Sequence, residues 1–196
     1  MKIALFGATG TVGSRIAKEA QSRGHSVTPI ARSGADARDA AAVAKAVAGH
    51  DAVVSAVGPR GSPDELSEAA RGLIAGSRKA GVPRLLIVGG AGSLEVAPGK
   101  RLVDTPQFPA GWKPVALAHA SALEVYRKER DLDWTYLSPA ALLEPGPRTG
   151  RYRTGDDRLI TDAKGDSRIS TEDFAVALVD ELEKPRHSRR RFTVAW

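Results

Sequence analysis

Short apolar runs alternate with amphipathic segments along most of the chain. The apolar runs, each short enough for a strand, cover residues 2–6, 26–31, 52–58, 84–90, 133–139 and 191–196. Between them, apolar residues recur three or four positions apart, which predicts helices over 11–24, 39–49, 62–81, 115–130 and 170–185. Strands joined by crossover helices predict an α/β fold with a mostly parallel sheet and helices on both faces.

Capping residues mark several of these helix ends. Ser62 as N-cap, Pro63 and Glu65 predict the start of the helix over 62–81. Ser170 and Asp173 predict the start of the last helix in the same way. The element boundaries therefore follow from local chemistry as well as from periodicity.

A glycine-rich loop joins the first predicted strand to the first predicted helix. In "GATGTVG", Gly7 permits the sharp turn, Gly10 lets the backbone approach a pyrophosphate, and Gly13 allows close packing of helix on sheet. The helix N-terminus offers unpaired N–H groups to phosphate. We expect dinucleotide contacts from this loop: Gly7, Thr9, Gly10, Thr11, Val12 and Gly13. The alternative is a turn that uses glycine only for its geometry.

The end of the second predicted strand bears on the choice of cofactor. NAD-binding folds place a carboxylate there for the ribose hydroxyls, whereas NADP-binding folds place an arginine for the 2′-phosphate. Here Arg32 and Ser33 occupy the place, and no acidic residue occurs between Glu19 and Asp36. The pattern predicts NADP(H) in preference to NAD(H). Alternatively, Arg32 is an exposed loop residue, and Asp36 caps the following helix or reaches the ribose itself.

Composition narrows the remaining classes of function. The 196 residues, 42% of them apolar, favour one globular domain over 1–196. The absence of cysteine excludes disulfides and thiolate chemistry and suits a cytoplasmic location. No apolar run is long enough for a membrane helix, the N-terminus lacks a signal-peptide pattern, and no metal-ligand spacing occurs.

The net charge of +6 includes a dense basic run at residues 186–191. Such a run can bind nucleic acid, but no aromatic residues alternate with these arginines as stacking platforms would. We interpret the run as a solvated turn before the last strand. A small molecule is therefore the expected partner, with neither nucleic acid nor membrane.

Candidate catalytic residues are few. The Tyr-x-x-x-Lys pair of short-chain dehydrogenases is absent, since Arg130 stands four residues after Tyr126. Ser93, after the strand at 84–90, could bind a substrate carbonyl or simply cap a turn. His119 could donate a proton near neutral pH or serve only in packing.

Two long irregular segments, 91–114 and 144–158, are candidates for a substrate lid. Phe108 and Trp112 in the first, and Tyr152 with Arg153 in the second, could stack on a planar ring and neutralise an anion. The alternative is that these side chains cover the edge of the core.

Several blocks together resemble one protein family. "KIALFGATGTVG", "AGHDAVVSAVGP", "RLLIVGGAGSL", "LDWTYLSPA" and "SRISTEDFAVALVDELEKP" are similar to atypical short-chain dehydrogenases of the NADH-flavin reductase group, related to NmrA-like proteins and biliverdin-IXβ/flavin reductase. The resemblance implies a single Rossmann-type, doubly wound domain. It also implies cofactor contacts from Ala56, Val57, Gly58, Gly89, Gly90 and Pro139, the last near the nicotinamide.

One departure from that family lies between the second strand and "ADARDAAAV". Relatives place a helix and a third strand there, and this chain lacks or shortens them. The missing strand would lie at the sheet edge, so the core could survive with a more open adenosine pocket. The exposed edge could pair across a homodimer.

The resemblance leaves three functions to weigh. The first is an NADPH-dependent reductase of a planar conjugated acceptor such as a flavin or quinone. The second is a non-catalytic NADP(H) sensor of NmrA-like type. A nucleotide-sugar epimerase or dehydratase is disfavoured, because Leu117 and Ser121 stand where its Tyr and Lys would be.

Overall fold

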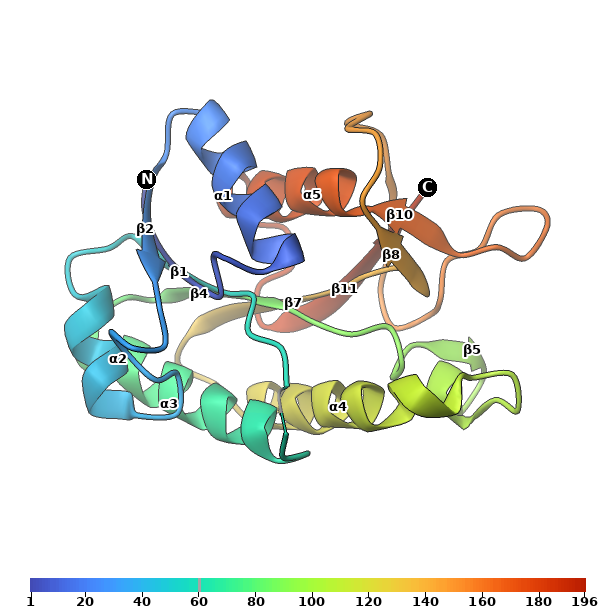
Figure 1. Ribbon diagram of the computed structural model, residues 1–196, viewed down its shortest axis with the longest axis horizontal. Coiled ribbons are helices and arrows are strands. Elements are labelled where there is room, and N and C mark those ends of the chain that lie inside the picture. The colour runs from blue at the N-terminus through green and yellow to red at the C-terminus, as the bar shows by residue number, and fades with distance from the viewer. Residues whose placement is uncertain (60) are drawn as a thin grey trace.

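The computed structural model describes residues 1–59 and 61–196. It contains a seven-stranded sheet flanked by five α-helices (Figure 1). The strands of this sheet are β1 (Lys2–Phe6), β2 (Ser26–Ile30), β3 (Ala52–Ser55), β4 (Arg84–Val88), β7 (Asp133–Ser138), β9 (Arg153–Gly155) and β11 (Arg190–Ala195). The helices are α1 (Thr11–Ser22), α2 (Ala40–Val47), α3 (Glu65–Ala80), α4 (Lys113–Arg127) and α5 (Thr171–Glu183).

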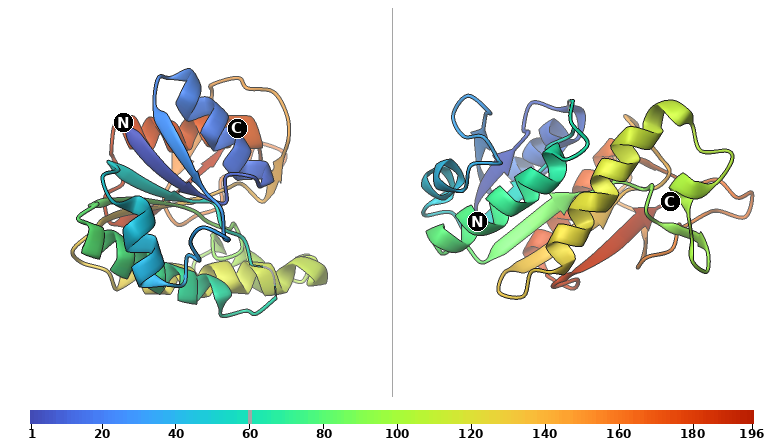
Figure 2. Two further views of the ribbon diagram at one scale, coloured as in Figure 1. Left: turned by 60° about the vertical axis from the view of Figure 1, so that its left-hand side comes forward. Right: turned by 90° about the horizontal axis from the view of Figure 1, so that it is seen from below.

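The strands lie in the order β2-β1-β3-β4-β7-β11-β9, and only β9 runs antiparallel to its neighbour. Helices α1 and α5 cover one face, and α2, α3 and α4 cover the other (Figure 1). Seen from below, α3 and α4 cross the sheet side by side (Figure 2). The predicted doubly wound α/β architecture is confirmed. The chain leaves β1 in one direction to form β2 and in the other to form β3, so the strand order reverses beside β1.

Alternating strand positions supply two separate hydrophobic layers. Ile3 and Leu5 of β1 pack with Phe174 of α5 on one face. Phe6 of the same strand and Trp134 of β7 join the other cluster, with α2, α3 and α4. These residues are at most 2% exposed. The sheet is thus buried on both sides, as its continuous apolar strands require.

The strand that the family places third is absent from the described residues, and β2 forms the sheet edge. After Ile30 the chain turns through 31–39 directly into α2, which packs on α3. Two glycines of α3 permit this close approach. A Cβ on Gly72 would lie 2.3 Å from the carbonyl oxygen of Ala37, and one on Gly76 would lie 2.5 Å from Cβ of Val43.

One predicted helix start was wrong. Helix α3 begins at Glu65 with Asp64 as its N-cap, because a turn closed by the Glu65 N–H and the Ser62 carbonyl (3.2 Å) precedes it. Helix α2 starts within one residue of its predicted range of 39–49: Asp39 caps it, with its carboxylate accepting the N–H groups of Ala41 and Ala42, so the alternative cap Asp36 is not used.

The segment 91–114 is less irregular than its proline and glycine content predicts. It holds a small hairpin of β5 (Glu95–Ala97) and β6 (Lys100–Arg101) and two short 3-10 helices, Leu102–Asp104 and Ala110–Trp112. The Glu95 N–H donates to the Asp157 carbonyl (2.8 Å), and the Leu159 N–H donates to the Glu95 carbonyl (2.9 Å). The two predicted lid segments are therefore hydrogen-bonded to each other. Two further short strands, β8 (Leu142–Glu144) and β10 (Arg168–Ser170), pair in parallel after β7.

Candidate functional site

A cleft of about 640 Å³ opens where β1, β2 and β3 end, beside the reversal of strand order. The glycine loop, with its small side chains, forms one wall of the cleft, and the segment that follows β2 forms another. Of the predicted cofactor residues, the cleft is lined by Gly7, Thr9, Gly10, Arg32, Ser33, Asp36, Ala56, Val57 and Gly58. Folding thus brings together predicted residues from three separate strand ends.

Each of the three glycines of the loop has a different structural role. Gly7 has φ +77°, and a Cβ there would lie 2.5 Å from the Ala56 carbonyl oxygen. A Cβ on Gly13 would lie 2.1 Å from the Gly7 carbonyl oxygen, so this residue sets the distance between α1 and the loop. A Cβ on Gly10 would meet only that same oxygen, at 3.4 Å, so Gly10 borders open space in the cleft.

The N-terminus of α1 suits an anionic group. No side chain caps it at Gly10, and its first turn, which includes Thr11, Val12 and Gly13, carries no acidic residue. Side chains cap α2 and α5 but not α3 and α4, so α1 is distinguished by following the glycine loop that lines the cleft. The positive end of the helix dipole and its first N–H groups therefore remain for a ligand phosphate. Together with the room above Gly10, this end fits the pyrophosphate of a dinucleotide.

The lining of the cleft also includes two arginines, Arg32 and Arg38, with carboxylates beside them. Arg32 lies 3.6 Å from Asp36 and 3.6 Å from Glu65. Arg38 lines the cleft too, and it binds Asp36 closely, with 2.6 Å between Nη2 and Oδ2. Hydrogen bonds from Arg38 hold the pKa of Asp36 far below its usual range, so this carboxylate is charged.

Sequence reasoning missed Arg38. Counting from the glycine loop points only to the end of β2, and Arg38 lies beyond it in a segment whose course the sequence did not define. Arg38 lies close to the cleft because no third strand follows β2, so the segment between β2 and α2 runs directly along the cleft. A basic residue just after a suspected deletion was the available signal.

The other residues expected to contact the cofactor, among them Pro139 near the nicotinamide, lie farther along the same sheet edge. Gly89, Gly90 and Pro139 follow β4 and β7 and do not line the cleft. A Cβ on Gly89 would lie 2.0 Å from the Tyr136 ring, and one on Gly90 would lie 2.9 Å from Cβ of His119. Close packing against Tyr136 and His119 is therefore enough to explain glycine at these two positions. Their contact with a cofactor stays a prediction.

His119 faces this packed region. The hydroxyl of Tyr136 donates to the His119 carbonyl (3.0 Å) and lies 3.3 Å from its Nδ1. Burial lowers the pKa of His119 to about 4, so the imidazole is neutral at pH 7. A neutral ring can donate a hydrogen bond, but it is a poor source of a proton. The structure therefore does not favour His119 as a general acid near neutral pH.

Ser93 lies in a different pocket, of about 300 Å³, between α4 and the start of β11. Its hydroxyl accepts a hydrogen bond from Nη1 of the buried Arg191 (2.8 Å), and Arg191 also binds Asp157. The hydroxyl thus helps to hold the two long segments on the sheet. Its predicted contact with substrate has no support from this position.

The four predicted lid residues do not converge on the cleft. Trp112 is 68% exposed, and Phe108 is half-buried in the loop before it. Tyr152 packs against the core and donates its hydroxyl proton to Asp180 of α5. Arg153 donates to the carbonyl oxygens of Trp196 (2.9 Å) and Thr161 (3.1 Å).

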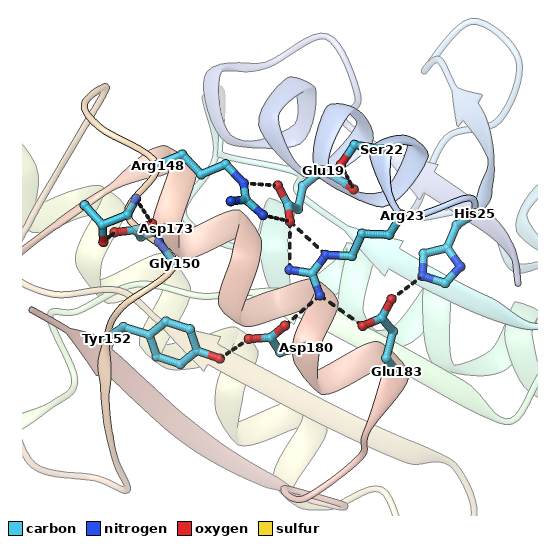
Figure 3. Close-up of polar contacts among 11 residues, drawn as sticks. Glu19, Ser22, Arg23, His25, Arg148, Gly150, Tyr152, Asp173, Asp180 and Glu183 are labelled. Carbon is cyan, nitrogen blue, oxygen red and sulfur yellow. Dashed lines mark hydrogen bonds and ion pairs between the residues drawn. The ribbon is translucent and has the colours of Figure 1, made fainter.

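A network of charged groups holds the segment 148–152 against α1 and α5 (Figure 3). The Glu19 carboxylate accepts hydrogen bonds from Arg148 (2.7 and 2.8 Å), which hold its pKa below the usual range. Arg23 joins the same carboxylate to Asp180, the acceptor of the Tyr152 hydroxyl. This explains why Tyr152 lies on the face of α5 instead of covering the cleft.

Residues 1–59 and 61–196 contain no group of three or more histidine, aspartate or glutamate side chains placed to hold a metal ion. In the same residues, no helix has both the length and the apolar character needed to cross a membrane.

Comparison with known proteins agrees with the geometry. A family model described as NAD(P)H-binding matches residues 33–185. The uncharacterized protein YwnB of Bacillus subtilis is 45% identical over 208 residues, covering 99% of this chain and 98% of YwnB. That alignment is longer than this chain, so the relative carries residues that this chain lacks.

Solved structures are similar along the whole chain as well. A Bacteroides thetaiotaomicron protein, provisionally named an epimerase, is 43% identical with a TM-score of 0.93, over 100% of this chain and 96% of that one. A Streptococcus pneumoniae protein, provisionally named an NADH-flavin reductase, is 37% identical with a TM-score of 0.86, over 100% and 99%. With the glycine-loop cleft, these matches show that the chain belongs to the NAD(P)H-binding family, with a Rossmann-type fold.

Proposed function

We propose that this protein is an NADPH-dependent reductase that transfers hydride to a planar conjugated acceptor such as a flavin or quinone. The observation that carries the proposal is the cleft, which is lined both by the glycine loop that leads into the uncapped N-terminus of α1 and by two arginines. The first fits the pyrophosphate, and the second fits the phosphorylated ribose of NADPH.

The tyrosines of the chain argue against a tyrosine-dependent mechanism. Burial raises the pKa of Tyr126, Tyr136 and Tyr152, so each holds its proton more firmly than a free phenol does. None of them lines the cleft. An epimerase or dehydratase that needs a reactive Tyr/Lys pair is therefore disfavoured, although one similar protein carries such a provisional name.

The main task of the residues that line the cleft is then to hold the cofactor in position for hydride transfer. The bound reduced nicotinamide supplies the hydride. The glycine loop holds the phosphates, and Ala56, Val57 and Gly58 offer an apolar wall beyond it. A flavin or quinone can take its proton from solvent, so no protein acid is required. The name of the 37% identical Streptococcus pneumoniae protein favours the same class of acceptor.

An acceptor screen tests the proposal. Purified protein is mixed with NADPH and either FMN or a quinone, and the loss of nicotinamide absorbance is followed. We expect a rate proportional to protein concentration. Gly10→Val should abolish it without unfolding the protein, because the added side chain occupies the phosphate position with only one protein atom near its Cβ. Gly111→Ala, with no atom within 4 Å of the new Cβ, is the matched control.

A non-catalytic NADP(H) sensor is the second candidate, because the missing Tyr/Lys pair fits it as well. The sensor predicts comparable binding of NADP+ and NADPH and no turnover with any acceptor. Such a result would replace the reductase proposal. A cytoplasmic location is part of the proposal, since a chain without cysteine suits a reducing compartment, and cell fractionation tests it.

A further inference from the structure

The segment that replaces the third strand forms a wall of the cofactor cleft. Ala35, Asp36, Ala37 and Arg38 all line it. Ala35 and Ala37 are 4% and 7% exposed, so these two alanines anchor the segment in the core. The side chains of Asp36 and Arg38 are partly exposed. This arrangement brings a second guanidinium to the ribose end of the cleft, beside Arg32.

Contact with α3 fixes the position of Arg38. A Cβ on Gly72 would lie 2.3 Å from the Ala37 carbonyl oxygen and 2.6 Å from the Arg38 carbonyl carbon. The backbone on either side of the Ala37–Arg38 peptide therefore rests directly on the helix. Arg38 is thus placed by a packed interface, and its side chain turns back toward Asp36.

Asp36 acts as an internal counter-ion. Its Oδ1 accepts the Arg38 backbone N–H (3.0 Å) and Nε (3.0 Å), and its Oδ2 accepts Nη2 (2.6 Å). Arg32 approaches the same carboxylate at 3.6 Å. Two guanidiniums therefore share one carboxylate inside the cleft, in the planar geometry that also suits a phosphate.

We propose that Arg38 determines cofactor specificity with Arg32, by binding the 2′-phosphate of NADPH in place of Asp36. Asp36 weakens this binding, because a charged carboxylate repels the phosphate and occupies the guanidinium. With NADH the Arg38–Asp36 pair stays intact, so Arg38 contributes little. This inference rests on the proposed binding of NADPH and adds a residue that counting from the glycine loop does not reach.

Calorimetric titration with four ligands tests the inference without any turnover. The ligands are NADPH, NADH, 2′,5′-ADP and 5′-AMP, of which the last two isolate the adenosine end. We expect Arg38→Ala to weaken NADPH and 2′,5′-ADP binding by about tenfold to a hundredfold, the effect of losing hydrogen bonds to a charged group. Binding of NADH and 5′-AMP should change by less than about twofold.

Three further variants sharpen the test. Arg38→Lys keeps the charge but loses the planar pair of donors, so it should fall between Arg38→Ala and the wild type. Asp36→Asn should strengthen NADPH binding relative to NADH. Arg71→Ala removes a neighbouring arginine that does not line the cleft and should leave all four affinities unchanged.

The outcomes separate this inference from the proposed function. Suppose that the wild-type protein binds NADPH and that Arg38→Ala and Arg38→Lys leave the ratio of NADPH affinity to NADH affinity unchanged. The role of Arg38 is then overturned, and the proposed function is not. Equal weakening of all four ligands does the same, because it indicates a structural role. A folded wild-type protein that binds neither dinucleotide overturns both proposals. Circular dichroism establishes that each variant is folded.

Discussion

Asp173 provides the sharpest test of how the segment 144–158 is held. This residue lies in the first turn of α5 and is 0% exposed. Its carboxylate accepts the N–H groups of Thr149 and Gly150 (2.8 Å each), the Thr149 hydroxyl and Nε1 of Trp196 (2.7 Å). One buried carboxyl group therefore fixes a turn of the second long segment and the last residue of the chain.

Replacing Asp173 by alanine removes all four acceptor contacts. A strong hydrogen bond of this kind contributes about 1.5 to 3 kcal/mol, but Thr149 and Gly150 are exposed residues, so their freed N–H groups can bind water. We therefore expect a loss of about 3 kcal/mol in the free energy of unfolding, less than the four contacts would sum to. For a chain of this length that corresponds to a fall in Tm of about 6 to 12 °C.

Urea and thermal unfolding measure the loss, and calorimetry with NADPH measures cofactor affinity on the folded variant. Affinity should stay within about twofold, because neither Asp173 nor its partners line the cleft. Asp166→Ala is the control, since that side chain is 55% exposed and lies 3.7 Å from Arg168. An unchanged stability would refute the ascribed role of the carboxylate. A tenfold weaker affinity would show instead that this segment belongs to the cofactor site.

Three other predictions concern the cleft and its surroundings. Gly13→Ala should abolish cofactor binding and lower Tm, because its Cβ would lie 2.1 Å from the Gly7 carbonyl oxygen; normal affinity in calorimetry would contradict this. Gly72→Ala should cost about 1 to 3 kcal/mol of stability and reduce the preference for NADPH, since it displaces the backbone at Arg38; unchanged urea unfolding and an unchanged affinity ratio would argue against that contact. Burial lowers the pKa of His119 to about 4, so the unfolded chain binds the extra proton and stability falls as pH drops from about 6.5 to 4. In His119→Asn the slope of stability against pH in this window should be smaller by up to about 1.4 kcal/mol per pH unit, and urea titrations that give the same slope would show that His119 is not the group responsible.

Much of the fold could be predicted from the sequence, because the residues that specify each element lie close together in the chain. The apolar run at Lys2–Phe6, the three glycines after it and the amphipathic helix from Thr11 specify a strand, a turn and a helix within a few residues of one another. Each preference depends on backbone conformation and periodicity, which neighbours in sequence determine. The edge position of the lost strand also followed, because the rest of the sheet does not depend on an edge.

The candidate site was only partly readable. Gly7 and Arg32 were found because their spacing from a strand end is fixed by the fold. Tyr152 was proposed to contact the substrate because its segment looked irregular, and Ser93 because it follows a strand end, yet the Tyr152 hydroxyl binds Asp180 and the Ser93 hydroxyl binds Arg191. Those partners lie 28 and 98 positions away in the chain, and no local pattern reports them.

The sequence by itself therefore determined the α/β class, the glycine loop and the expectation of a nicotinamide cofactor. The tertiary structure alone decided which side chains face the cleft. Arg38 enters it because Gly72 of α3 lets the shortened segment lie close, a contact between residues distant in the chain. Spacing can specify a turn, but the direction of a side chain at a ligand depends on what packs behind its backbone.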